Sequence, residues 1–200
     1  MVLTKLVMNL ESRAARRDLA NAYQMHSTLM RLVDSGAGKP LWRLERPPRA
    51  GPHIVLIQTE SAPPRSALRE VDEEYFVSFE SRENRLLANL AAGDLLRFRV
   101  RANPTVTREK KRHGLVRDEE QIGWIERQLR RNGATPKVAE VLDSRSEVFR
   151  RRRGGAPVTI VGVTYDGSLR VDDPLLLRGA VVRGIGHGRS FGFGLITLGR

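Results

Sequence analysis

Apolar and polar residues near the start of the chain follow patterns that predict a strand and then a helix. Val2 to Met8 alternates like a half-buried strand. After a basic, helix-prone stretch, Ala22 to Val33 carries apolar residues at helical spacing, which predicts one buried stripe. The elements expected next are two strands, a short helix and a strand, at Leu41 to Leu44, Ile54 to Thr59, Ser66 to Asp72 and Tyr75 to Phe79. The order of these elements is β-α-β-β-α-β.

The second half of the chain is expected to repeat this order without repeating the residues. Its first strand is Leu95 to Ala102, and Asp118 is expected to cap the following helix. Asp166 and Gly167 form a dipeptide typical of a tight turn. The remaining elements are two hairpin strands, a helix and a last strand, at Val138 to Phe149, Val158 to Tyr165, Asp173 to Gly184 and Leu195 to Leu198. We therefore expect an α+β protein with two tandem domains, residues 1–85 and 86–200.

The charge of the chain narrows the choice of partner. Lys and Arg number 35 against 23 Asp and Glu, a formal net charge of +12, which predicts a polyanionic partner: nucleic acid first, an anionic membrane second.

No apolar run approaches the roughly 20 residues of a membrane-spanning helix, and the start of the chain is too polar for a secretory signal. Cysteine is absent, which excludes disulfides and thiolate metal sites and fits a cytoplasmic location.

Three arginines share one face of the strand Leu95 to Ala102: Arg97, Arg99 and Arg101. One interpretation is a solvated face whose charge is incidental. Three guanidinium groups in a row with no carboxylate between them repel one another, however, unless an anion lies across them. We therefore favour phosphate binding by this face.

Two further segments are candidates for binding phosphate. The first is a basic hairpin tip that is followed by Gly154 and Gly155 and consists of Arg150, Arg151, Arg152 and Arg153. This run is either a solvated loop or a grip on a phosphate backbone, and charge alone does not separate the two. The second is Gly184 to Leu195, in which five glycines allow the backbone to approach a ligand closely. A tight turn between helix and strand explains the same glycines. The candidates within it are Gly186, Gly188, Arg189 and Ser190.

The helix at Ala22 to Val33 carries two residues that could act on one substrate. Tyr23 and His26 are three residues apart and can point to one site, although a lone histidine beside an apolar stripe is more often structural. Arg31 projects about 140° away from His26 on an ideal helix. The acidic pairs at 73–74, 119–120 and 172–173 consist of neighbours in sequence whose side chains diverge. We therefore expect neither a metal nor a cofactor.

These segments, in this order, resemble the CasE-type repeat endoribonucleases, which process the guide RNA of type I-E CRISPR interference complexes. The resemblance spans the chain and is carried by Leu3 to Asp18, Tyr23 to His26, Arg97 to Pro104, Glu119 to Leu129 and Gly184 to Leu195. It implies two ferredoxin-like domains, the first with the catalytic helix and the second with the basic hairpin and the glycine-rich loop. It also implies that the other subunits of such a complex are partners.

By this resemblance His26 is the catalytic histidine and Tyr23 is its partner at the scissile phosphate. The resemblance also implies a catalytic role for a basic residue later in the same helix, which is Arg31 here and lysine in other members. The implied ligand is a repeat stem-loop, as precursor and as mature guide RNA, which Arg13, Arg16 and Arg17 are also expected to contact. The implied reaction needs no metal: the RNA 2′-hydroxyl attacks, leaving a 2′,3′-cyclic phosphate and a 5′-hydroxyl. An imidazole with a pKa of about 6.5 can take or donate the proton. The alternative is a non-catalytic RNA-binding scaffold of the same fold.

Overall fold

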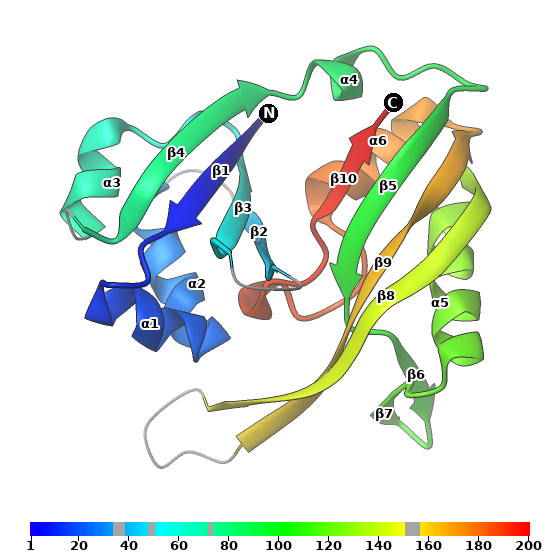
Figure 1. Cartoon of the computed structure of the whole chain (residues 1–200). Helices are drawn as coiled ribbons and strands as arrows, with labels where there is room; N and C mark the ends of the chain where they lie inside the picture. Colours follow the sequence, from blue (N-terminus) through cyan, green and yellow to red (C-terminus); the bar gives the residue numbers. More distant parts are fainter. Residues whose placement is uncertain (34–38, 48–50, 72–73, 151–156) are drawn as a thin grey trace. The chain divides into compact units, whose positions relative to one another are not determined.

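The computed structural model describes residues 1–33, 39–47, 51–71, 74–150 and 157–200, which form two compact units (Figure 1). One unit contains residues 1–84 together with the short segments 149–150 and Ser190–Gly192. The other contains residues 85–148, 157–189 and 193–200. Each unit has its own four-stranded sheet.

The first unit has the predicted β-α-β-β-α-β order, with two helices where one was expected. Its elements are β1 (Val2–Met8), α1 (Arg13–Leu19), α2 (Ala22–Met30), β2 (Leu41–Glu45), β3 (Ile54–Thr59), α3 (Arg65–Val71) and β4 (Phe76–Glu83). The sheet order is β2-β3-β1-β4, and β1 pairs antiparallel with both β3 and β4. Leu6 of β1 and Ile57 of β3 are fully buried in one core with Leu29 of α2 and Leu68 of α3.

The second unit repeats the topology. Its elements are α4 (Arg85–Ala88), β5 (Leu95–Ala102), β6 (Thr105–Arg108), β7 (Lys111–Gly114), α5 (Asp118–Arg131), β8 (Ala134–Arg150), β9 (Pro157–Val171), α6 (Pro174–Arg183), a 3-10 turn (Arg189–Phe191) and β10 (Ile196–Gly199). The sheet order β10-β5-β9-β8 matches that of the first unit, strand for strand. The two ferredoxin-like units expected from the sequence are therefore confirmed.

Capping residues explain where two helices of the second unit begin, and one prediction about them was wrong. Asp173 caps α6, because its carboxylate accepts from the backbone N–H groups of Leu175 and Leu176 at 2.9 and 3.0 Å, and Pro174 follows at the first helical position, as predicted. Asp118, in contrast, is the first residue of α5 and not its cap. The cap is Arg117, whose side chain makes no capping bond. Acidic residues in the first turn favour this helix start through the helix dipole.

The tight turn predicted at Asp166 and Gly167 does not exist, because both residues lie inside β9. Gly167 pairs with Phe98 and Asp166 with Arg99 in the register of β5 and β9. A Cβ on Gly167 would collide with the main-chain carbonyl of Val138. The glycine thus permits close approach of two strands, a use of glycine that the dipeptide alone does not reveal.

Candidate active site

Helix α2 holds the two residues predicted to act on substrate. Asn21 caps the helix, and its side-chain oxygen accepts from the backbone N–H of Tyr23 at 3.0 Å. Met25 and Leu29 are buried in the core. Tyr23 and His26 are both half-buried, and their spacing makes them neighbours on the helix surface. The structure therefore brings these two side chains to one face of α2.

The imidazole of His26 is half-buried beside the core of the first unit. Its Nδ1 atom is buried and lacks a hydrogen-bond partner within the described part of the chain. Burial lowers the pKa of His26, and the charge of Lys39 lowers it further. The ring is therefore mainly neutral at pH 7, with a lone pair available. His53 also has a buried Nδ1 atom without a partner among the described residues, but it precedes β3 and lies outside α2.

A buried carboxylate ties α2 to its neighbours. Asp18, in α1, is 1% exposed and accepts from the hydroxyls of Thr28 at 2.6 Å and Tyr75 at 2.8 Å, and from Nε of Arg17 at 2.8 Å. Burial and the bond to Asp18 raise the pKa of Tyr75, so its hydroxyl remains a donor. A buried carboxylate is stable when its oxygens are bonded in this way, and losing a partner is costly. The network holds α1, α2 and the segment before β4 together.

The three arginines of α1 differ in what they contact. Arg16 donates to the carbonyl oxygens of Leu10 and Glu11 at 2.6 and 2.9 Å and so stabilises the turn between β1 and α1. Arg17 pairs with Asp18, whose hydrogen bond and charge raise the pKa of the guanidinium. Arg13 is exposed. RNA binding by these three residues stays a prediction.

Arg31 is the C-cap of α2 and points its guanidinium at α3. Its Nη2 atom donates to the carbonyl oxygen of Glu70 at 2.8 Å. The bond joins the end of α2 to the last turn of α3. A catalytic role for Arg31 stays a prediction.

The repulsion argument for the arginine face on β5 fails for two of its three members, whose binding of phosphate stays a prediction. Arg99 pairs with Asp166 at 2.6 Å, and Arg101 is buried in an ion pair with Glu147. Both carboxylates come from other strands of the same sheet and neutralise the repulsion that suggested a bound phosphate. Arg97 is exposed and remains a candidate for phosphate binding.

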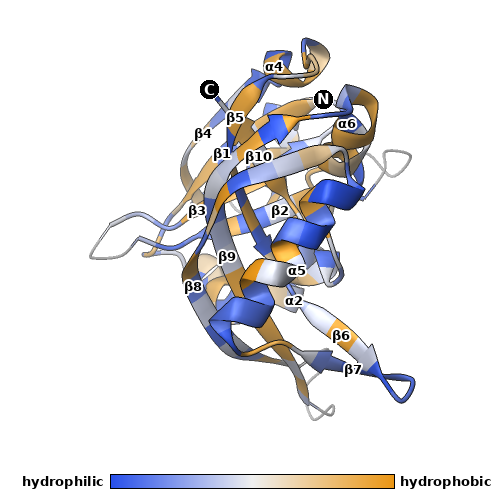
Figure 2. Cartoon of the chain, turned by 90° about the vertical axis from the view of Figure 1, so that its right-hand side faces the viewer, coloured by the Kyte–Doolittle hydropathy of each residue, from blue (hydrophilic) through white to orange (hydrophobic). Residues whose placement is uncertain are grey.

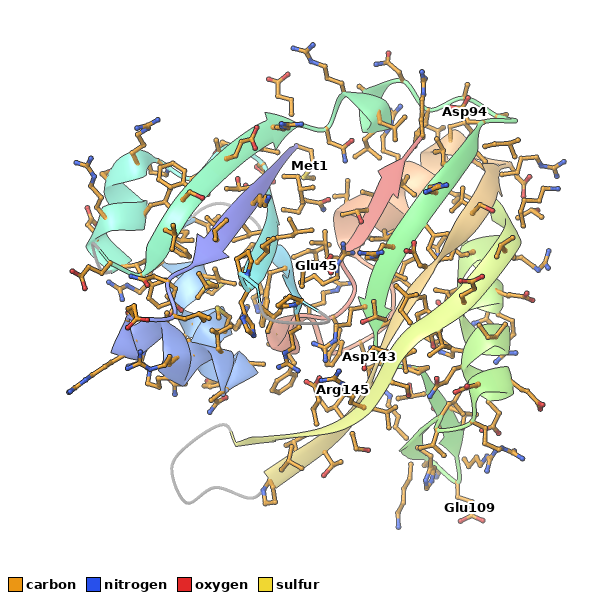
Figure 3. The ribbon with its side chains drawn as sticks, in the orientation of Figure 1. Met1, Glu45, Asp94, Glu109, Asp143 and Arg145 are labelled. Atoms are coloured by element: carbon orange, nitrogen blue, oxygen red, sulfur yellow. The ribbon has the colours of Figure 1, made fainter. Side chains whose placement is uncertain are left out.

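The expected hairpin of β8 and β9 is present, because these strands are neighbours in the sheet. Its tip, with Arg151, Arg152 and Arg153, lies outside the described residues, as does the side chain of Arg150. Nearer the middle of β8, Arg145 and Asp143 form an ion pair in which Nε lies 2.7 Å from the carboxylate (Figure 3). Phosphate binding by the four arginines of the tip stays a prediction.

The glycine-rich segment needs its glycines for conformation. Gly186 and Gly188 have φ angles of 80° and 87°, which disfavour other residues. A Cβ on Gly188 would lie 2.9 Å from the ring of Phe193. His187 and Arg189 beside them are exposed, and Ser190 is half-buried. These observations support the tight turn, and they leave phosphate binding by this segment as a prediction.

A second basic hairpin was missed in the sequence. Strands β6 and β7 form a two-stranded sheet, and Glu109 and Lys110 take positive φ angles of 49° and 61° at its turn. Figure 2 shows β7 and this turn in the hydrophilic colour. All four residues of Lys110–His113 are exposed. We call Lys110, Lys111 and Arg112 the basic arm. The run of basic residues was a usable signal, but the segment lacks the apolar alternation that predicts a strand.

The basic arm adds to the charge around the glycine-rich segment. Burial lowers the pKa of His187, and the charges of Arg112 and then Arg189 lower it further. Arg112 on β7 and Arg189 therefore act on the same imidazole. The second unit gathers cations from two separate segments, which favours a polyanion as ligand.

Neither a metal cluster nor a membrane span is found in the described part of the chain. No group of three or more His, Cys, Asp or Glu side chains among these residues is arranged to hold a metal ion. No helix among them is long and apolar enough to cross a membrane.

Comparisons with known proteins match the whole chain. The model of a family described as CRISPR associated protein matches residues 1–200. The CRISPR-associated endoribonuclease Cse3 of Thermus thermophilus is 38% identical over 214 aligned residues, covering 99% of each chain. The CRISPR system Cascade subunit CasE of Escherichia coli is 31% identical and covers 99% of this chain and 98% of its own. A structure of the CRISPR endoribonuclease Cse3 bound to 19 nt RNA has a TM-score of 0.90 at 35% identity, with full coverage of both chains.

Proposed function

We propose that this chain, which belongs to the CRISPR-associated protein family, is an endoribonuclease that binds the hairpin of CRISPR repeat RNA and cleaves it to give guide RNA. The observation that carries the proposal is the half-buried His26, which shares a helix face with Tyr23. The full-length similarity to Cse3 and CasE supports the substrate. Because CasE is a Cascade subunit, other subunits of such a complex are proposed partners.

The proposed reaction uses the RNA as its own nucleophile. His26 accepts the proton of the 2′-hydroxyl next to the scissile phosphate as the O2′–P bond forms. The P–O5′ bond breaks, and O5′ takes up a proton from water. The products are a 2′,3′-cyclic phosphate and a 5′-hydroxyl, and no oxidant, reductant or metal enters the balance. A neutral imidazole suits the base role, and the lowered pKa of His26 provides it at pH 7.

Tyr23 and the hydrogen-bond network of Asp18 assist the reaction without taking the proton. The Tyr23 hydroxyl is a hydrogen-bond donor one helical turn from His26, where it can stabilise charge on the phosphate oxygens. The Asp18 network keeps α2 in place. Because the reaction needs in-line attack, fixed positions of the reacting groups supply a large part of the rate enhancement. The chemistry therefore depends on the position of α2 as much as on the imidazole.

Cleavage in excess chelator at several pH values tests the proposal. We expect a labelled repeat hairpin to be cut at the normal position, and kcat/KM to fall as the pH drops through the pKa of His26 in the free enzyme. Because burial lowers that pKa, the midpoint should lie below the ordinary value of about 6.5. Binding without cleavage under all conditions would instead support the non-catalytic scaffold. A rate that chelator abolishes would contradict the metal-free reaction.

The basic arm is expected to supply phosphate contacts to the hairpin. Changing Lys110, Lys111 and Arg112 together to alanine should reduce the log–log salt slope of binding by about 0.7 to 0.9 for each phosphate that loses its cation. Fluorescence anisotropy at several salt concentrations measures the slope. The matched control removes the same charge from the exposed side of α5, at Arg127, Arg130 and Arg131. If both triple variants change the slope equally, net charge and not the arm is responsible.

A further inference from the structure

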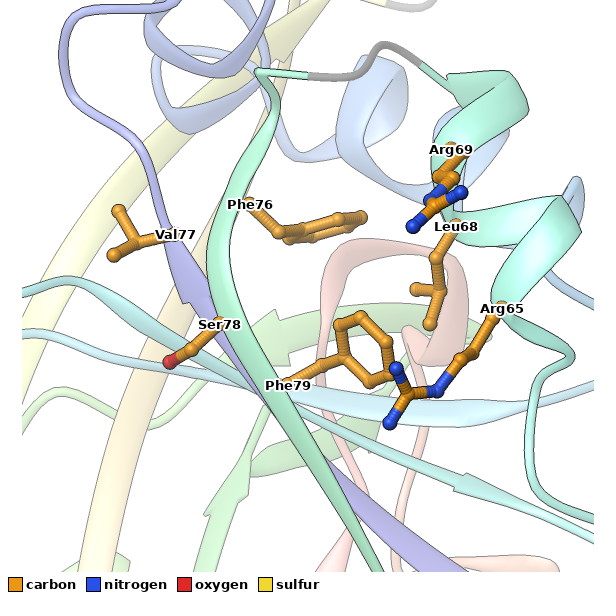
Figure 4. Close-up of a pocket in the computed structure, with 7 residues that line it drawn as sticks. All are labelled: Arg65, Leu68, Arg69, Phe76, Val77, Ser78 and Phe79. Atoms are coloured by element: carbon orange, nitrogen blue, oxygen red, sulfur yellow. The ribbon is translucent and has the colours of Figure 1, made fainter.

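A pocket of about 320 Å³ in the first unit lies between α3 and the edge strand β4, and the proposed reaction does not use it (Figure 4). Arg65 and Arg69 line it from α3, and Phe76 and Phe79 line it from β4. Both arginines are exposed, and Phe79 is 37% exposed. The described lining residues include no acidic side chain. Cations and aromatic rings thus line the same open pocket.

An irregularity in β4 creates this arrangement. Phe76 and Phe79 are three residues apart, so a regular strand would direct them to opposite faces. The pairing of β1 with β4 shifts register between Val7 and Met8: Val7 faces Ser78 and Met8 faces Phe76, which leaves Val77 as an extra residue. Figure 4 shows the two rings on the α3 side of β4 and Val77 on the other. The bulge therefore adds a second ring to the pocket.

The contacts inside the pocket favour a nucleotide. The guanidinium carbon of Arg65 lies 5.5 Å from the ring centre of Phe79, a cation–π geometry that a flat base can share or replace. Aromatic faces with adjacent arginines are the usual platform for single-stranded nucleic acid, because every base has a π face and every linkage a charge. β1 is the sheet neighbour of β4 in the described structure, so the outer edge of β4 can offer backbone groups to a base.

The pocket also adjoins the end of the proposed catalytic helix. The bond from Arg31 to the carbonyl of Glu70 joins the end of α2 to the last turn of α3. Arg69 is the residue before Glu70 in α3, and it lines the pocket. The contact between α2 and α3 therefore lies one residue along the chain from Arg69 of the pocket.

We propose that this pocket binds one unpaired nucleotide from the single-stranded RNA flanking the hairpin, with its base stacked on Phe79 and its phosphate paired with Arg65 and Arg69. This inference rests on the proposed function, because it assumes that the substrate is a hairpin with unpaired flanks. The site would contribute to affinity and to the placement of the cut, and would leave recognition of the stem to other residues.

The test compares three RNAs that carry a 2′-deoxy nucleotide at the cut: the trimmed hairpin, the hairpin with a 5′ flank and the hairpin with a 3′ flank. Phe79→Ala should weaken binding of one flanked RNA by about 5- to 150-fold, the usual contribution of one stacked base. The double change Arg65→Ala with Arg69→Ala should weaken binding of the same RNA and lower the salt slope of its binding, because both arginines pair with the phosphate. Binding of the trimmed hairpin should change less than about twofold. Phe79→Leu keeps apolar volume without the flat ring and should resemble Phe79→Ala. Arg82→Ala, an exposed arginine of β4 outside the pocket, is the matched control.

The flank whose binding weakens identifies the source of the nucleotide. Equal weakening on trimmed and flanked RNAs would assign the arginines to the stem and overturn the proposal, and so would unchanged binding of every RNA. If wild-type protein fails to bind the trimmed hairpin, the proposed function fails, and the pocket is then judged with a short unstructured RNA. Ultraviolet crosslinking to that RNA should give an adduct within Phe76–Phe79. Adducts confined to other segments would overturn the pocket assignment.

Discussion

Replacing His26 by alanine is expected to lower the single-turnover cleavage rate by about 10²- to 10⁴-fold, the usual contribution of a general base. Burial lowers the pKa of His26, so the neutral ring that a general base needs predominates at pH 7. Affinity for the hairpin should change less than about twofold, because one neutral side chain is removed while the phosphate contacts that dominate binding remain. Gel-based cleavage with saturating protein measures the rate, and anisotropy measures affinity.

The matched control for this experiment is His53→Ala. His53 is a half-buried histidine of the same unit, and its Nδ1 atom likewise lacks a partner among the described residues. The change therefore reproduces the loss of an imidazole without touching α2. Thermal unfolding of both variants reports on any common loss of stability. Wild-type cleavage by the His26 variant, or an equal loss in both variants, would contradict the catalytic assignment.

Local patterns predicted the elements that local forces decide. Alternation gave the bounds of β1 and β5 correctly, and the Asp173 and Pro174 pair gave the start of α6. Both features act through the nearest residues along the chain, so the sequence displays them directly. The repeated element order was sufficient to predict two ferredoxin-like units.

Contacts between distant residues account for the errors. The partners of Arg99 and Arg101 are 67 and 46 residues away along the chain, and their carboxylates become neighbours only when β8 and β9 join the sheet. The bond between Asp18 and Tyr75 spans 57 residues. The Asp166 and Gly167 pair has the local signal of a turn, but pairing with β5 overrides it. Tertiary pairing decided each of these positions.

In the candidate site, too, local spacing predicted part of the arrangement and contacts between distant residues decided the rest. Helical spacing alone predicted that Tyr23 and His26 share a face, and both residues lie in α2. The state of the imidazole could not be predicted, because its burial and the charge of Lys39 depend on how the chain folds around α2. The pocket between α3 and β4 depends on a β-bulge that the residue types of β4 do not predict.

A repeat hairpin with a single 2′-deoxy nucleotide on the 5′ side of the cut is expected to bind normally and to resist cleavage completely. Removal of one oxygen deletes the proposed nucleophile and leaves every phosphate and the stem in place. The effect should be larger than for any protein variant, because no side chain can substitute for the missing O2′. Denaturing gels over long incubation in excess chelator measure residual cleavage, and an all-ribose hairpin is the control.

The outcome separates two chemistries that would give fragments of the same length. A nuclease that activates water attacks the phosphate from outside the RNA, so it would cut the deoxy hairpin and leave no cyclic phosphate. His26 and Tyr23 on one face of α2 are suited to the other route, in which the enzyme moves one proton and holds O2′ in line with the P–O5′ bond. Cleavage of the deoxy hairpin at the normal position would therefore falsify 2′-hydroxyl attack while leaving the RNA-binding surfaces intact. Full resistance with unchanged affinity would show that the RNA's own 2′-oxygen is the nucleophile. The protein would then act as the general base and hold the RNA in the in-line geometry.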